Sequence, residues 1–419
     1  MSRHRRSRRS AHVGAWGAVA VTAAAVVAAG SGAAAAEDGA VPLAGCPGLL
    51  VIGVQGTSES SPTASPTLDT GMLGTMFGPM LSRGVDIDRV YIGYSASFGG
   101  AVGTGPGVQP YADSTAQARA RLDATAAEAI AQCPGTQLAV AGFSQGAAVV
   151  SGFAQDVGAG HGPVPADRIA GVALLSDPTR PSGGEPIPGR PGQVTPDPAP
   201  GTDGTTTSQV RLAPVPPSGG IADTGTHFDA LEGRVGEFCA PHDLACDAPD
   251  NAAALQVAAG VAAQADLRDP ITAVGSLAVA WQAAASEAGN EVILADVTVE
   301  AGQVNYVPGK TVSQRLAEAA DPTAADPGPQ QAQAAADKTG QVVAAIAADP
   351  LGQIPRLVGQ IGAAIGAELA ANADLFNPAT LMHYASAITS HTSYGASGQT
   401  ANAADWFAAV SHDLSGERR

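Results

Sequence analysis

The sequence predicts an α/β fold: a mostly parallel, five-stranded central sheet covered by helices, with a large, mainly helical insertion. Two observations predict it. Between residues 46 and 247, short runs of β-branched and aliphatic residues alternate with helical stretches, which is typical of a parallel sheet with covering helices. From Ala248 to Met382 the chain becomes Ala-rich and helical. Because 45% of the 419 residues are hydrophobic and only 4% are aromatic, we expect a sizeable core built from small side chains.

Composition and turn residues mark the elements of the sheet domain. We expect a helix over Asp113–Gln132, capped by Asp113 or Ser114, because Ala, Arg and Leu fill this segment. The segment Asp177–Thr207 is rich in Pro, Gly and Thr, so we expect a surface loop or a disordered excursion and assign it no function. The five strands are expected at Leu49–Val54, Arg89–Tyr94, Gln137–Ala141, Ile169–Ser176 and Arg234–Phe238.

The insertion and the tail that follows it contain further local signals. A small hairpin is expected from Glu291–Val299 and Gln303–Val307, around the turn residues Ala301 and Gly302. Asp321–Gln330 has the composition of a Pro/Ala/Asp linker, and a helix is expected at Ala403–Val410 in the tail. Apolar residues also repeat at helical spacing, which places five of them on one helix face: Ile354, Leu357, Val358, Ile361 and Ile365.

The first 36 residues have the features of an export signal. An arginine-rich start precedes an uncharged run from Val13 to Ala29, and three alanines ending at Ala36 offer a small-residue cleavage site. Arg8 and Arg9 also leave a twin-arginine export route open beside the general one. A retained membrane anchor is the alternative, but the run is Ala-rich and short for a bilayer span, which needs about 20 residues. We therefore expect a secreted or cell-envelope protein.

Charge and cysteines narrow the class of protein further. The chain has 38 acidic against 21 basic residues, so a nucleic-acid partner is not expected. No later stretch has the length and hydropathy of a membrane span. The cysteines show no CxxC spacing and no zinc-finger spacing to histidines, so no metal site is expected. An even number of cysteines in an oxidising compartment favours two disulfides, drawn from Cys46, Cys133, Cys239 and Cys246.

Residues 142–146 fit the pattern GxSxG, with Ser144 at its centre. The pattern alone is weak in a chain with 52 glycines, but its setting strengthens it, since a predicted strand precedes it and a helical stretch follows. A nucleophile elbow needs this arrangement, in which glycines allow a tight strand-to-helix turn that presents the serine hydroxyl. The start of the helix also favours the negative charge that develops during acyl transfer. Ser144 is therefore the predicted nucleophile.

A serine nucleophile needs a base and an acid further along the chain, because α/β-hydrolases place them in the order Ser, acid, His. Pattern alone leaves His383, His391 and His412 open as the base. Asp243 is a candidate acid because a disulfide between Cys239 and Cys246 would hold it in a small rigid loop after a strand. Asp177, at the end of the preceding strand, is its rival.

Several stretches of the chain resemble cutinases, serine esterases with the α/β-hydrolase fold. Residues 142–147 (GFSQGA) resemble the family's elbow, and residues 243–246 (DLAC) resemble its acid loop, which implies Asp243 as the acid. Residues 391–395 (HTSYG) resemble its His-x-x-Tyr-Gly motif, which selects His391 as the base. Residues 55–59 (QGTSE) resemble its oxyanion loop, so the resemblance implies that Thr57 and the backbone N–H of Gln145 bind the oxyanion. The cysteines also match, implying the pairs Cys46–Cys133 and Cys239–Cys246.

The chain departs from the family pattern at two places. His242 stands where the family has a glycine before the acid, so this position lacks the freedom of glycine at positive φ, and a second imidazole adjoins Asp243. The family also joins acid and base by a short loop, whereas here the helical insertion separates them. We therefore expect a discontinuous catalytic domain (37–247 and 383–419) interrupted by the insertion (248–382), after the signal peptide (1–36).

These features predict a secreted carboxylic ester hydrolase that acts on lipid-like or acyl esters through an acyl-enzyme and needs no cofactor. The natural ester is not identified by the sequence. Two alternatives remain: an envelope acyltransferase with the same triad, and a non-catalytic envelope-binding protein on a hydrolase scaffold. The insertion begins after the acid loop and ends before the base, so we expect it to be a lid over the site, an interpretation favoured over an independent helical bundle.

Overall fold

The computed structural model describes residues 45–223, 225–324 and 327–417, so the predicted signal peptide lies outside the described residues. The central sheet has five strands in the order β2-β1-β3-β4-β5, and every neighbouring pair is parallel. This confirms the predicted sheet, with strand ends that differ by at most three residues from those expected. The strands are β1 (Leu49–Val54), β2 (Ile87–Tyr91), β3 (Gln137–Phe143), β4 (Ile169–Leu175) and β5 (Val235–Phe238).

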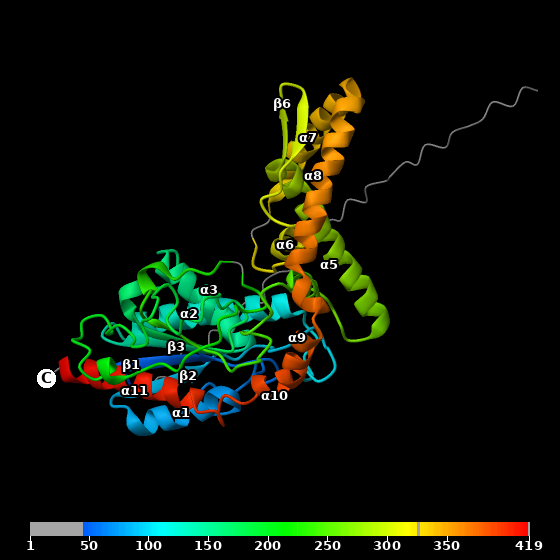
Figure 1. Ribbon diagram of the computed structural model, residues 1–419. Coiled ribbons are helices and arrows are strands. Elements are labelled where there is room, and N and C mark those ends of the chain that lie inside the picture. The colour runs from blue at the N-terminus through cyan, green and yellow to red at the C-terminus, as the bar shows by residue number, and fades with distance from the viewer. Residues whose placement is uncertain (1–44, 224, 325–326, 418–419) are drawn as a thin grey trace, which may run out of the picture. The chain divides into compact units, whose positions relative to one another are not determined.

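Helices cover both faces of the sheet (Figure 1). Because successive side chains of a strand point to opposite faces, β1 contributes to two cores. Leu49 and Val51 lie in the cluster formed with α1 (Gly71–Arg83) and α11 (Gln399–Glu417), both seen below the sheet in the figure. Leu50, Ile52 and Val54 lie in the opposite cluster, formed with α2 (Tyr111–Gln132) and α3 (Gln145–Gly158). The predicted C-terminal helix is thus present and longer than expected.

The predicted cap of α2 is wrong. The helix begins at Tyr111, directly after Pro110, and neither Asp113 nor Ser114 caps it. Ser114 is fully buried, and its hydroxyl is engaged in tertiary contacts: it accepts a hydrogen bond from the backbone N–H of Ser97 at 3.1 Å and lies 2.9 Å from the Ser95 hydroxyl. A serine that bonds to a neighbouring loop cannot also satisfy the helix N-terminus, and the sequence does not reveal that loop.

The segment Asp177–Thr207 is a packed loop, so the alternative of a disordered excursion is wrong. Arg180 is fully buried, and its Nε donates to the carbonyl of Cys246 at 2.8 Å. Ile187 is also fully buried, and the carbonyl of Pro186 accepts from the backbone N–H of Glu237 on β5 at 2.9 Å. The loop is therefore tied to the sheet by buried contacts that its composition conceals.

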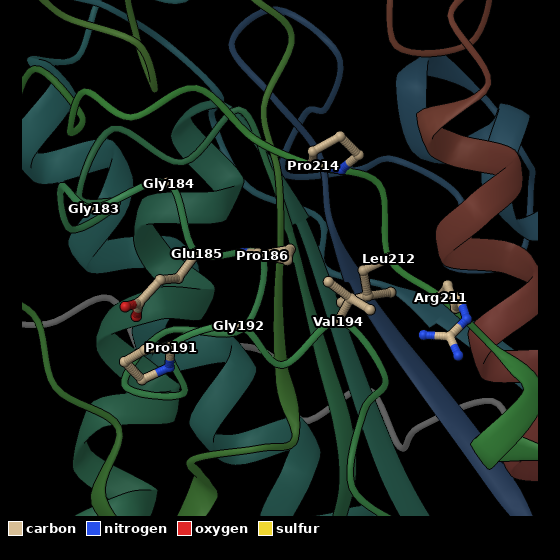
Figure 2. A pocket seen from close by; sticks show the side chains of 10 residues that line it. All are labelled: Gly183, Gly184, Glu185, Pro186, Pro191, Gly192, Val194, Arg211, Leu212 and Pro214. Atoms are coloured by element: carbon tan, nitrogen blue, oxygen red, sulfur yellow. The ribbon is translucent and has the colours of Figure 1, made fainter.

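A pocket of about 450 Å³ lies along this loop. Figure 2 shows Val194 and Leu212 next to each other, with Glu185 and Arg211 on opposite sides of them. None of the predicted triad residues lines this pocket, so it is separate from the candidate active site.

The insertion is mainly helical, as predicted, and forms its own small cores. Val257, Ala284 and Ala320 belong to one cluster, and Val297, Val304 and Ala345 belong to a second. No helix of the described residues is long and apolar enough to cross a membrane. The insertion contains the helices α4 (Ala253–Ala263), α5 (Pro270–Glu291), α6 (Val312–Ala319), α7 (Gly328–Ala348), α8 (Pro350–Ala371) and α9 (Pro378–His383).

The predicted hairpin is present but shorter than expected. It consists of β6 (Val297–Glu300) and β7 (Gln303–Tyr306), with antiparallel pairing. Its turn residues Ala301 and Gly302 have φ values of 49° and 76°, as a tight hairpin turn requires. Residues 292–296, expected to begin the first strand, form a π-helical turn at the end of α5.

The apolar face predicted on α8 is real but largely uncovered within the single chain. Leu357 packs against the second cluster of the insertion. Ile354, Val358, Ile361 and Ile365 are exposed, with exposed fractions between 47% and 63%. Their function as part of a lid stays a prediction.

Both disulfides have the pairing that the resemblance implies. Cys46 is bonded to Cys133, which joins the start of β1 to the end of α2. Cys239 is bonded to Cys246, which closes the loop that follows β5 and carries Asp243.

Candidate active site

Ser144 lies at the turn between β3 and α3, where its backbone has φ 54° and ψ −119°. This conformation is costly for a residue with a side chain, and such strain recurs at functional positions. The two neighbouring glycines are needed for space. A Cβ at Gly146 would lie 2.0 Å from the carbonyl oxygen of Val54, and one at Gly142 would lie 2.4 Å from that of Gly146. The strand–turn–helix geometry of a nucleophile elbow is therefore present at Ser144.

The predicted acid and base meet, although 148 positions separate them in the sequence. Nδ1 of His391 lies 2.8 Å from Oδ1 of Asp243. Asp243 follows β5 inside the small disulfide loop, and His391 ends α10 (Ala387–His391). The Asp243 side chain is 1% exposed and that of His391 30%, so the acid is buried while the imidazole reaches the surface. This is the arrangement in which a carboxylate orients a histidine for proton transfer.

Four hydrogen bonds satisfy the carboxylate of Asp243. Besides His391, the backbone N–H of Ala245 donates to Oδ1 at 3.1 Å. The hydroxyls of Ser176 and Tyr394 each donate to Oδ2 at 2.6 Å. Burial by itself would raise the pKa of Asp243, but the hydrogen bonds from His391, Ser176 and Tyr394 outweigh burial and hold this pKa below its ordinary value. Asp243 is therefore an anion that can only accept hydrogen bonds.

Two of these partners had no role in the prediction from sequence. Tyr394 occurs in the motif that selects His391, but the motif does not show that its hydroxyl reaches Asp243 and also accepts from the backbone N–H of Ala240 at 3.1 Å. Ser176 ends an expected strand and carries no motif of its own. A serine after a strand is a common occurrence, so no sequence signal marks it.

His242, which stands where the family pattern has glycine, has φ 69°, a conformation that favours glycine. Its backbone N–H donates to Oδ2 of Asp247 at 2.7 Å, which holds the turn despite the cost of a side chain at positive φ. The loop thus forms without glycine at this position, and Asp243 is hydrogen-bonded to His391.

His391 lies next to the elbow. Its ring packs on that of Phe143, the residue before Ser144, with centroids 5.3 Å apart. Among the described residues, the Ser144 hydroxyl has no hydrogen-bond partner. Asp243 and His391 are therefore hydrogen-bonded to each other, while Ser144 lies nearby without a hydrogen bond to His391. Catalytic hydrogen bonds are often long without substrate and tighten when it binds.

The two predicted oxyanion residues are linked to each other. The Thr57 hydroxyl donates to Oε1 of Gln145 at 3.3 Å, and Nε2 of Gln145 donates to the carbonyl of Ser97 at 3.0 Å. Gln145 is the first residue of α3, where backbone N–H groups have no acceptor within the helix. This leaves its N–H available to an anion at the elbow.

Glu59 fixes the loop that carries Thr57. Its carboxylate accepts from the backbone N–H of Gly56 at 3.2 Å and from that of Met72 at 2.9 Å. Burial raises the pKa of Glu59, against the lowering effect of these two N–H groups. Glu59 thus ties the loop after β1 to the start of α1.

Two of the rival candidates, Asp177 and His412, have other partners. Asp177 is fully buried, and its carboxylate accepts from the backbone N–H of Thr179 at 2.9 Å and from the Thr179 hydroxyl, so it serves a turn. Nε2 of His412 lies 3.0 Å from the carbonyl oxygen of Arg83. His383 ends α9. Among the described residues, no group of three or more His, Cys, Asp or Glu side chains is placed to hold a metal ion.

Asp177 makes the stability of the protein depend on pH. Burial raises its pKa to about 6, against the lowering effect of the Thr179 hydrogen bonds. The folded protein therefore takes up this proton at a higher pH than the unfolded chain, so the free energy of unfolding rises as pH falls from 7 to 4. A difference of about two pKa units corresponds to roughly 3 kcal/mol. We expect Asp177→Asn to remove the part of this increase that Asp177 contributes, as measured by chemical denaturation at pH 4, 5, 6 and 7.

Glu237 gives the pH dependence that should remain in the variant, and an exposed aspartate provides the control. Burial raises the pKa of Glu237 well above its ordinary value, and the nearby Asp177 adds to this effect, so the contribution of Glu237 to the slope should remain in the variant. Asp250→Asn, at an exposed position, is the matched control and should leave the slope unchanged. An Asp177→Asn protein with the wild-type slope would contradict the prediction.

A parallel sheet, a serine on a strained strand-to-helix turn and an adjacent histidine paired with a buried aspartate define the class of this protein: a serine ester hydrolase with an α/β fold. The chain belongs to the cutinase family, whose model, described as Cutinase, matches residues 45–265. It is also similar to a protein of Corynebacterium glutamicum named Carboxylesterase Culp6 homolog. The two are 30% identical over 224 residues, which cover 49% of this chain and 67% of that protein.

Solved structures with related folds share less sequence. The catalytic core domain of acetyl xylan esterase from Trichoderma reesei is 18% identical, covers 56% of this chain and 99% of its own, and has a TM-score of 0.35. A cutinase-like protein from Cryptococcus sp. is 19% identical, covers 49% of this chain and 81% of its own, and has a TM-score of 0.29.

Proposed function

We propose that this protein is an exported carboxylic ester hydrolase that forms an acyl-enzyme on Ser144, with His391 as the base and Asp243 as the acid. The observation that carries the proposal is the 2.8 Å hydrogen bond between His391 and Asp243 next to the strained serine turn. Two disulfides support export, since such bonds persist in oxidising compartments.

Each step of the reaction uses a residue of this site. Nε2 of His391 takes the proton of Ser144 as Oγ attacks the ester carbonyl carbon, and the alcohol leaves with that proton. Water then attacks the acyl-enzyme and gives its proton to His391, which returns it to Ser144 as the acid departs. Asp243 stabilises the charged imidazole. The backbone N–H of Gln145, with the N–H or hydroxyl of Thr57, binds the oxyanion; the Thr57 hydroxyl must turn from Gln145 to do so.

The substrate class we propose is lipid-like or acyl esters, and the insertion is proposed as the lid that selects them. This proposal rests on topology. The insertion begins shortly after Asp243 and ends shortly before His391, and these two residues are hydrogen-bonded to each other. Both ends of the insertion are thereby held near the acid and base. The exposed apolar residues of α8 would contact an acyl chain if the lid closed over one.

The test is an acyl-chain-length profile for hydrolysis of simple esters, with and without an acceptor alcohol. We expect free acid as the main product and a preference for long chains over acetate. In a variant whose residues 248–382 are replaced by a short Gly/Ser loop, the preference should be lost while acetate ester hydrolysis remains.

Two results would contradict these proposals. If the acceptor alcohol captures most of the acyl group in water, the protein is an acyltransferase. If the folded deletion variant keeps the wild-type profile and rate, the insertion is not a lid.

A further inference from the structure

Ser176 is a buried serine in a conformation that favours glycine. It follows β4, is fully buried and has φ 56°. Glycine adopts this region without steric cost, whereas a residue with a Cβ is penalised there. The backbone is held by the sheet edge, since the N–H of Ser176 donates to the carbonyl of Phe238 at 2.9 Å. The side chain is thus kept where the backbone disfavours one, and its hydroxyl is directed at the acid–base pair.

The hydroxyl of Ser176 contacts both members of that pair. Its Oγ lies 2.6 Å from Oδ2 of Asp243 and 3.0 Å from Nδ1 of His391. A hydroxyl has one proton and two lone pairs, and an ionised carboxylate can only accept. The proton of Ser176 therefore goes to Asp243, and a lone pair faces the imidazole.

Nδ1 of His391 carries hydrogen, because the ionised Asp243 beside it can only accept. This hydrogen is shared between Oδ1 of Asp243 at 2.8 Å and Oγ of Ser176 at 3.0 Å. Nε2 is then unprotonated in the neutral ring and free to take the proton of Ser144. Two oxygen atoms at different positions also restrict rotation of the ring more than one does.

We propose that Ser176 is a positioning residue that fixes the orientation of the His391 imidazole, with Nδ1 toward Asp243, by bonding to His391 and Asp243 together. Its effect on catalysis rests on the proposed esterase function, but its effect on the imidazole does not. Tyr394 differs in role: it donates to the same oxygen of Asp243 and accepts from the backbone of Ala240, so it anchors the acid.

The test compares Ser176→Ala with Ser176→Gly. Both remove the hydroxyl, but only the glycine variant also relieves the positive φ, so the two should differ in stability. If the hydroxyl positions His391, both should lose kcat by a similar factor, on the order of tenfold, with KM within about twofold of wild type. If Ser176 serves only the backbone, Ser176→Gly should keep the wild-type kcat, and that result would overturn the proposal.

A further variant separates contact with the imidazole from anchoring of the acid. Tyr394→Phe removes a donor to the same oxygen of Asp243 but removes no contact with His391. If the contact with His391 matters, Ser176→Gly should lower kcat more than Tyr394→Phe does. An equal loss of kcat in the two variants would count against the proposal.

The tautomer can be measured without turnover. Imidazole ¹⁵N spectra of histidine-labelled protein, assigned with a His391→Ala variant, should show Nδ1 protonated in the wild type. In Ser176→Gly they should show a mixture of tautomers, because the less restricted ring turns away from Asp243 for part of the time. A wild-type protein that hydrolyses no ester but shows this change would refute the proposed function and support the role of Ser176. The same pure tautomer in wild type and variant would refute the role of Ser176, whatever the activity.

Discussion

Replacing Ser144 by Ala is expected to lower ester hydrolysis by a factor on the order of 10⁴–10⁶, the scale of losing a nucleophile that acts as a unit with its base. The fold should be unaffected for two reasons. Alanine keeps the Cβ, so the strain of φ 54° is the same in both proteins. The Ser144 hydroxyl also has no hydrogen-bond partner among the described residues, so its loss leaves no buried donor unsatisfied. Turnover of a simple ester and labelling by a fluorophosphonate probe measure the effect.

Ser151→Ala is a control on the same helix, since Ser151 is fully buried and its hydroxyl bonds to that of Thr179. It should lower stability while leaving probe labelling in place. If Ser144→Ala retained near-wild-type hydrolysis or labelling, the nucleophile would lie elsewhere and the proposed mechanism would fail with it.

His391→Ala is expected to be about as damaging as the serine change, because a serine without its base is a poor nucleophile. Asp243 would keep three donors, from Ser176, Tyr394 and the backbone of Ala245, so its buried charge would not be left unpaired. The folded structure should therefore survive, and the loss should appear in kcat, measured beside the melting temperature.

His412→Ala and His383→Ala are the matched controls, and both should retain most activity. His412 contacts a backbone carbonyl at the end of α1. A dead His383→Ala enzyme beside an active His391→Ala enzyme would show that the base had been assigned to the wrong histidine.

Local features could be predicted because they leave a periodic or compositional record. The strand β1 was expected at the residues where it occurs, since a short run of aliphatic residues between turn signals is typical of a buried strand. The same is true of the elbow, where the geometry requires two glycines and a helix start, all adjacent in the chain. The predictions for the cap of α2 and for the loop after β4 were wrong for the opposite reason. Ser114 and Arg180 have hydrogen-bond partners in other segments of the chain, which local composition does not reveal.

The sequence by itself determined the class of fold, the turn at Ser144 and, through motifs, the residues expected to act with it. Residues close in the chain record their geometry in spacing and residue type. Only the tertiary structure decided that Asp243 meets His391, that Asp177 and His412 serve other contacts, and that Ser176 joins the acid to the base. These contacts form where the ends of β4 and β5 meet the segment after the insertion. Sequence spacing carries no record of them, because a parallel sheet brings together strand ends from separate parts of the chain.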